Sequence, residues 1–192
     1  MIENVKIVKQ NRKTISITVL NNETVLIKCP KLYSESRALE FASKKERWIN
    51  KKIGEIRAKN QKFAGVLQKE QSLVLGNLVP YIKKSEFERL AVSYLTQKSK
   101  EISQILGLQY NFLSFKNYKS RWGCCEAKKN VLLNYKLYML DEFTIKCVIV
   151  HELLHTLYLN HGKNFKNALK NIVGDPSIYK NRLKEVGFLL KI

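Results

Sequence analysis

Acidic residues are scarce in this chain. Of its 192 residues, 16 are Asp or Glu and 35 are Lys or Arg, so the formal net charge is +19 at pH 7. The resulting field attracts anions, which makes a nucleic acid one expected partner, through the basic surface; a well-solvated lysine-rich surface is the alternative interpretation. Hydrophobic residues make up 45% of the chain, which is enough to bury a core and excludes a disordered tail.

Cysteines and long apolar runs are also few. The four cysteines include no CxxC pair, and this spacing fits neither a disulfide framework nor a zinc ribbon; they are Cys29, Cys124, Cys125 and Cys147. No apolar run approaches the roughly 18 residues that a membrane span needs. The first ten residues lack the apolar stretch of a secretory signal. We therefore expect reduced thiols, a cytoplasmic location and no membrane partner.

The N-terminal part alternates between apolar and polar residues, as half-buried strands do. Residues 15–19 and 25–29 alternate on either side of a turn at Asn21-Asn22, which predicts a β-hairpin. The apolar period then lengthens from residue 34 to about residue 59, which predicts one long amphipathic helix capped by Ser34 or Ser36.

The remainder mixes helical and extended patterns. A short hairpin is expected around Gly76-Asn77, a helix over 86–106 ended by Gly107, and extended stretches over 110–126 and 131–138. Three further helices are predicted: one capped by Asp141, apolar on nearly all sides and running to about residue 159, one over 163–173, and one beginning at Pro176. These patterns predict an α+β fold in a single domain, 1–192, with an N-terminal subregion over 1–80 and a core over 81–192.

The three histidines of the chain, His151, His155 and His161, lie within eleven residues. The first two frame the pattern HExxH, which a chain of this length matches by chance about once in two hundred. Positions four apart return to nearly the same side of a helix, so the rings of His151 and His155 can share one metal ion. Glu152 stands beside the first ligand, where its carboxylate can reach a water molecule rather than the metal.

A third ligand requires the helix to stop. His161 would point about 120° away from His155 on a continuous helix. Asn160-His161-Gly162 tolerates a left-handed turn, and a chain reversal there would bring His161 back to the metal. Asp175 and Glu185 are the competing candidates. Three imidazoles leave a fourth position open, which is typical of catalytic rather than structural zinc.

This ligand set predicts one Zn²⁺ ion, because neutral imidazoles suit Zn²⁺ better than Mg²⁺. Zinc lowers the pKa of a bound water from about 15.7 toward 7, and Glu152 would act as the general base. A further group must help to stabilise the developing oxyanion. The candidates by residue type are Tyr135, Tyr138, Tyr158 and Arg121.

Together these residues resemble the YgjP-like metal-dependent hydrolases, small zincin-like proteins akin to the SprT-like, WLM and minigluzincin peptidases. The resemblance rests on residues 120–125 (SRWGCC), on Leu133-Asn134, on the HExxH motif and on residues 160–165; 12–14, 29–30 and 48–52 agree with the family's opening block. It implies a minimal zincin core, with the extended segments packed on the active-site helix. It also implies that Arg121 and Trp122 lie near the cleft and contact substrate; strand packing and a surface ion pair are the alternative.

The sequence therefore predicts a zinc metallohydrolase, with a peptide or protein as the first-ranked substrate. Two alternatives remain. The resemblance also allows a metal-dependent pyrophosphatase acting on UTP, although the sequence has no glycine-rich phosphate loop. The +19 charge allows a DNA-associated protein whose metal site acts on DNA-bound proteins.

Overall fold

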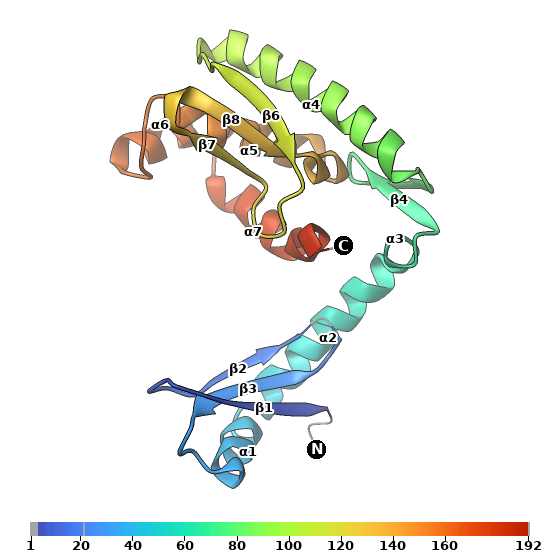
Figure 1. The fold of residues 1–192 in the computed structure, drawn as a ribbon, viewed down its shortest axis with the longest axis vertical. Coiled ribbons are helices and arrows are strands. Elements are labelled where there is room, and N and C mark those ends of the chain that lie inside the picture. The colour runs from blue at the N-terminus through green and yellow to red at the C-terminus, as the bar shows by residue number, and fades with distance from the viewer. Residues whose placement is uncertain (1–3, 21, 192) are drawn as a thin grey trace. The chain divides into compact units, whose positions relative to one another are not determined.

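The structure is a computed structural model that describes residues 4–20 and 22–191 (Figure 1). Its contacts divide the chain into two compact units, Met1–Leu67 and Gln68–Ile192. Each unit contains its own three-stranded sheet, and both combine strands with helices. The predicted α+β class is thus confirmed.

The first unit is built on a sheet with the strand order β1-β3-β2. The predicted hairpin is present: β2 (Ser16–Val19) pairs antiparallel with β3 (Val25–Pro30). Asn21 of the predicted turn lies outside the described residues. The sheet has a third strand that we did not predict, β1 (Val5–Gln10), which pairs parallel to β3.

Helices cover this sheet. Ser34 caps α1 (Glu35–Ser43) by accepting a hydrogen bond from the amide of Arg37. The prediction of one helix over 34–59 was wrong, because the chain breaks after Ser43 and α2 (Glu46–Lys62) begins three residues later. Periodicity did not reveal the break, because the apolar positions of the two helices continue one stripe. Residues of both helices share the buried cluster with β3; its members are Val25, Ile27, Ala38, Ala42 and Ile49. A short α3 (Ala64–Leu67) ends the unit.

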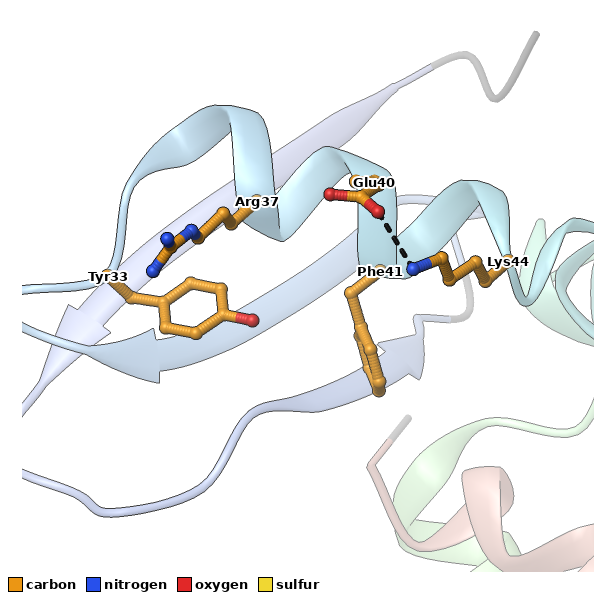
Figure 2. A pocket seen from close by; sticks show the side chains of 5 residues that line it. All are labelled: Tyr33, Arg37, Glu40, Phe41 and Lys44. Carbon is orange, nitrogen blue, oxygen red and sulfur yellow. Dashed lines mark ion pairs between the residues drawn. The ribbon is translucent and has the colours of Figure 1, made fainter.

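One side of α1 carries aromatic and basic side chains. Tyr33, Arg37 and Phe41 line a hollow of about 300 Å³ together with Glu40 and Lys44 (Figure 2). A second hollow of about 280 Å³ adjoins it and is also lined by Phe41; its other residues are Ile17, Lys45 and Trp48. We call the two hollows together the α1 face.

The second unit begins with the predicted hairpin, in which β4 (Gln71–Val74) pairs antiparallel with β5 (Asn77–Pro80). The long α4 (Lys84–Leu106) follows. It ends as predicted at Gly107, whose φ of 63° is the left-handed conformation that glycine adopts without steric cost.

A three-stranded sheet with the order β6-β8-β7 lies beyond α4 (Figure 1). β6 (Phe112–Lys116) pairs parallel to β8 (Asn130–Asn134), and β7 (Gly123–Glu126) pairs antiparallel to it, so β7 is an edge strand. A 3-10 turn, η1 (Ala127–Lys129), joins β7 to β8. The expected extended stretch over 131–138 is shorter than predicted: Asn134 ends the strand and caps the 3-10 helix η2 (Tyr135–Met139).

The centre of this unit is α5 (Glu142–Leu154), nine of whose thirteen residues are buried. This burial agrees with the nearly uniform hydrophobicity of the segment, because a helix that is apolar on all sides lies inside the protein. α6 (Lys163–Val173) and α7 (Pro176–Val186) pack against it. The final 3-10 helix, η3 (Gly187–Lys191), buries Phe188, Leu189 and Leu190. The Leu190 carbonyl also accepts a hydrogen bond from Lys136 Nζ at 3.0 Å, so this segment packs onto its own unit.

None of the helices in the described part of the chain combines the length and the apolar character needed to cross a membrane.

Candidate metal centre

The C-terminal end of α5 presents the first two histidines. Asp141 caps the start of the helix, accepting hydrogen bonds from the Thr144 amide and hydroxyl at 2.9 Å each. The helix ends at Leu154, and His155 is its C-cap, so it stops about five residues before the predicted end. The amides of Leu157 and Tyr158 both bond back to the Leu154 carbonyl. The chain therefore begins to turn directly after the second histidine.

The turn that returns the chain toward the helix is built differently from our expectation. We predicted a left-handed residue within 160–162, yet the described residues with positive φ include none of these three, and Gly162 has φ −65°. The Asn160 side chain makes the turn instead, because its Oδ1 accepts the Gly162 amide at 2.9 Å. A Cβ on residue 162 would lie 2.8 Å from that oxygen. A larger residue here would therefore displace the Asn160 side chain from its hydrogen bond.

The structure brings the three histidines together. Nε2 of His161 lies 3.2 Å from Nε2 of His155 and 3.0 Å from Nε2 of His151. One ring nitrogen of each residue falls within 4.8 Å of the others, and they form the candidate metal-binding group found among the described residues. His151 and His155 are half-buried and His161 is exposed. The group therefore lies at the surface end of a buried helix.

Hydrogen bonds on the other ring nitrogens indicate which tautomers are present. His155 Nδ1 lies 2.8 Å from the Tyr158 carbonyl, which can only accept, so Nδ1 carries the proton. His151 Nδ1 lies 3.2 Å from the Tyr179 hydroxyl on α7. If His151 Nδ1 likewise donates its proton to the Tyr179 hydroxyl, then Nε2 of His151 and Nε2 of His155 each direct a lone pair toward His161.

This donor set fits a divalent metal ion. Lone pairs facing one another at 3.0–3.2 Å repel unless a proton or cation lies between them. Tetrahedral zinc with bonds of about 2.0–2.1 Å would separate its nitrogens by about 3.3 Å, which is close to the spacing present. Three nitrogen ligands would leave one coordination position for water or substrate.

Phe165 of α6 supports all three rings. Its ring centroid lies 4.6 Å from that of His155, 4.8 Å from His161 and 5.0 Å from His151. The side chain is 2% exposed. A rigid apolar support of this kind restricts the ring orientations without competing for the ring nitrogens.

The electrostatic environment keeps His151 neutral. Burial, followed by the neighbouring His155 and His161, lowers the pKa of His151 to about 4. Burial also lowers the pKa of His161. A metal ion binds the neutral imidazole, so these shifts favour binding at neutral pH.

Glu152 lies on the buried side of the same turn and is 7% exposed. The Cys125 amide of β7 donates a hydrogen bond to its carboxylate, and Arg121 is close enough to act on it electrostatically. Burial raises the pKa of Glu152 to about 7, against the opposing effects of Arg121 and Cys125. A Cβ on Gly123 would lie 2.9 Å from Glu152 Cγ. Because residue 123 is glycine, strand β7 can lie against the carboxylate without displacing it.

The other residues singled out from the sequence lie in varied surroundings. Arg121 is exposed, and its guanidinium lies 5.4 Å from the Tyr118 ring centroid. Trp122 is only 8% exposed, and its carbonyl accepts the Asn134 amide at 2.8 Å. Their predicted contact with substrate stays a prediction.

The two competing ligands are engaged elsewhere. Asp175 caps α7 through Ser177, and Glu185 pairs with Arg182. Neither belongs to the candidate metal group.

The tyrosines considered for the oxyanion differ in their surroundings. Tyr138 packs against Phe87 and Tyr94 of α4, and Tyr135 bonds to Glu88. Tyr158 lines a hollow of about 410 Å³ that also involves Phe165. Of these three, Tyr158 is therefore the one that shares a hollow with a residue supporting the histidines.

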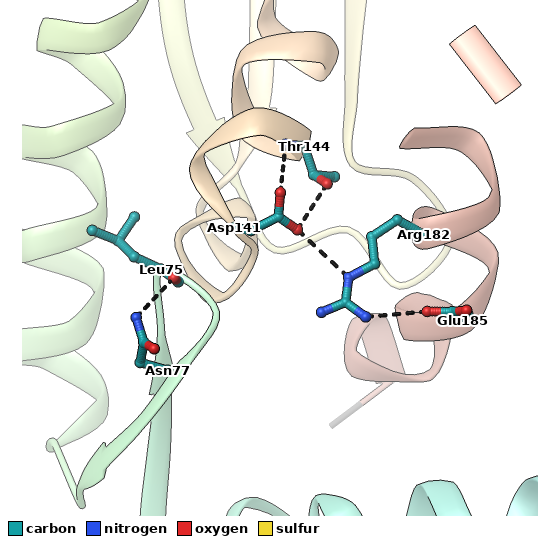
Figure 3. A network of polar contacts seen from close by, with 6 residues as sticks. All are labelled: Leu75, Asn77, Asp141, Thr144, Arg182 and Glu185. Carbon is teal, nitrogen blue, oxygen red and sulfur yellow. Dashed lines mark hydrogen bonds and ion pairs between the residues drawn. The ribbon is translucent and has the colours of Figure 1, made fainter. Parts of the chain in front are cut away.

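Helix α7 is attached to α5 at two points. Near the start of α5, Arg182 Nε lies 3.5 Å from the Asp141 carboxylate, and Arg182 also pairs with Glu185 (Figure 3). Near its end, Tyr179 contacts His151 and is 2% exposed. Sequence reasoning missed Tyr179, because no spacing rule links it to a histidine 28 residues earlier.

Comparison with known proteins gives one family match. A family model described as YgjP-like, metallopeptidase domain, matches residues 81–186, which include all three histidines and Glu152. The crystal structure of the metallopeptidase zymogen jannalysin of Methanocaldococcus jannaschii is similar to this chain, with a TM-score of 0.41 and 25% sequence identity. The match covers 50% of this chain and 96% of jannalysin. No curated protein matches the chain.

Proposed function

The chain belongs to the YgjP-like metallopeptidase family, and on this premise we propose that it is a zinc-dependent peptidase. His151, His155 and His161 would bind one Zn²⁺ ion, and Glu152 would be the general base. The observation that carries the proposal is the position of His161 Nε2, which lies 3.0–3.2 Å from Nε2 of the other two histidines; the residue after His151 is a buried carboxylate, Glu152. Neutral imidazoles favour zinc over magnesium, which prefers oxygen ligands.

The chain's own groups account for the proton transfers. A bound Zn²⁺ would lower the pKa of the attacking water and polarise the carbonyl of the peptide bond. The Glu152 carboxylate accepts the proton of the attacking water and delivers it to the leaving nitrogen. The Cys125 amide fixes the orientation of that carboxylate. Because Glu152 is buried, bulk water is excluded from the proton transfer.

An extended peptide suits the surroundings better than a nucleotide. β7 is an edge strand, and its Cys125 amide faces Glu152, so the outer edge of β7 borders the carboxylate. A peptide that pairs with this edge would carry its carbonyl groups past Glu152. Nucleotide hydrolysis would be favoured by carboxylate-held Mg²⁺, whereas the candidate ligands are three imidazoles.

The four cysteines are free thiols, two of them buried. This supports the expectation of a reducing, cytoplasmic compartment.

Two measurements test the proposal. Metal analysis of protein purified without added metal should find one equivalent of zinc per chain, and His161→Ala should remove it. Hydrolysis of a peptide library should fall by about 10²- to 10⁴-fold in Glu152→Gln, with zinc content unchanged. Glu86→Gln, at an exposed carboxylate in the first turn of α4, is the matched control and should keep wild-type activity.

UTP is assayed in parallel. Turnover of UTP but not of peptides would replace the proposal with the pyrophosphatase function. If wild type turns over neither substrate faster than Glu152→Gln, both hypotheses fail.

A further inference from the structure

The α1 face of the first unit has no role in the chemistry above, yet it combines aromatic rings with basic side chains. Phe41 lies between its two hollows, with Tyr33 and Arg37 on one side and Lys45 and Trp48 on the other. In Figure 2, the Tyr33 ring, from the segment before α1, and the Phe41 ring, from the helix, lie on the same side of α1, with the Arg37 side chain above Tyr33.

The aromatic residues of the α1 face are only partly buried. Tyr33 packs against the buried cluster under α1, so its ring position is fixed by the core. Trp48 is 44% exposed, and Phe41 is half-buried. An indole with nearly half of its surface in water has a face that a flat ligand can cover.

The charges on the two helices favour an anion. Residues 31–62 contain ten Lys and Arg against four Glu. Three of these carboxylates already have lysine partners: Glu40 with Lys44, Glu55 with Lys52 and Glu35 with Lys9.

The basic side chains beside the aromatic rings are in a different situation. Arg37 and Lys45 have no ion pair with any described carboxylate. Their charges are therefore available to an external partner that carries negative charge.

We propose that the α1 face binds single-stranded nucleic acid, with bases stacking on Trp48 and Phe41 and with phosphates contacting Arg37 and Lys45. Aromatic platforms beside cations are the common means of holding single strands, because each base has a flat face and each nucleotide one negative charge. A duplex keeps its base faces stacked inside, so it cannot use the rings. An acidic peptide matches the charge but gains little from two neighbouring aromatic hollows.

Fluorescence anisotropy of labelled 20-nucleotide oligo-dT and oligo-U, titrated with the full chain, tests the proposal. Both oligonucleotides should bind, and the comparison of their affinities shows whether the α1 face prefers DNA or RNA. A duplex of equal length should bind at least tenfold more weakly. Trp48→Ala should weaken binding about 5- to 100-fold, whereas Trp48→Phe should retain most of the affinity. Tyr81→Ala, at a residue 50% exposed in the second unit, is the aromatic control and should change nothing.

The charges are tested through salt. The slope of log affinity against log salt should decrease by about 0.7 for each phosphate contact removed from a single strand, so the double variant Arg37→Gln/Lys45→Gln should lose about 1.4. Lys184→Gln in α7 is the matched control.

Several results would overturn the proposal: no binding, equal affinity for the duplex, an unchanged affinity in Trp48→Ala, or tighter binding of a poly-glutamate peptide. The comparison of single strand with duplex uses wild-type protein, so this test remains valid even if a variant fails to fold. Peptide hydrolysis should be unaffected by every variant of the α1 face, which separates this test from that of the peptidase.

Discussion

The contact between Gly123 and Glu152 gives the sharpest test of how the edge strand positions the proposed general base. In Gly123→Ala, the new Cβ would lie 2.9 Å from Glu152 Cγ, 3.1 Å from Oε1 and 3.2 Å from Cδ, whereas ordinary contacts begin near 3.4 Å. Either the carboxylate or the strand must move by the difference, 0.5 Å at the closest atom. A misplacement of 1 Å can cost about 10²-fold in rate, so we expect a loss of about 10-fold in kcat.

The assay compares kcat, zinc content and thermal stability of wild type and variant. Overpacking a tight contact typically costs about 1–3 kcal/mol, so a lower melting temperature should accompany the loss of rate. Zinc content should remain at one equivalent, because the altered atom contacts Glu152 and none of the three ligands. Gly187→Ala is the control, since nothing lies within 4 Å of its new Cβ and its φ of −57° suits alanine. A wild-type kcat in Gly123→Ala would refute the reasoning.

Three further predictions concern the same unit. Tyr179→Phe removes the hydroxyl that lies 3.2 Å from His151 Nδ1 and should weaken zinc binding about 10- to 100-fold in competition with a chromophoric chelator; an unchanged affinity would contradict a positioning role. In metal-free protein, burial raises the folded-state pKa of Glu152 from 4.5 to about 7, so its contribution to stability is present below pH 4.5 and lost as pH rises through 7. Urea denaturation in EDTA should therefore find Glu152→Gln more stable than wild type at pH 8, by up to about 3 kcal/mol, and similar at pH 4; equal stability at both pH values would count against it. Asp141→Ala removes a helix cap and should cost about 1–2 kcal/mol in urea unfolding, more than Arg182→Ala, which breaks a partly exposed ion pair worth about 0.5 kcal/mol; the reverse order would show that the ion pair matters more than the cap.

Local patterns predicted several elements because the responsible interactions lie within a few residues. Asp141 caps α5 by bonding to an amide three residues later, and Gly107 ends α4 through its own backbone conformation. The hairpin at Gly76 depends on the turn between two short strands. Such features follow from side-chain type and position alone.

The sequence also determined the composition of the candidate metal group. Two histidines one helical turn apart can converge whatever surrounds the helix, and the chain has one more histidine to complete the group. Sequence reasoning left Asp175 and Glu185 as competing third ligands. Only the folded chain separates them from the group, because both are engaged in α7.

Tertiary structure decided what surrounds those ligands, because the contacts join segments far apart in sequence. Tyr179 meets His151 across 28 residues, and the Cys125 amide meets Glu152 only after β7 has paired with β8. The parallel strand β1 likewise depends on a partner that forms 20 residues later. No local periodicity encodes such contacts. They exist because burying α5 brings β7 and α7 against it, and that packing fixes the ring orientations and the environment of the carboxylate.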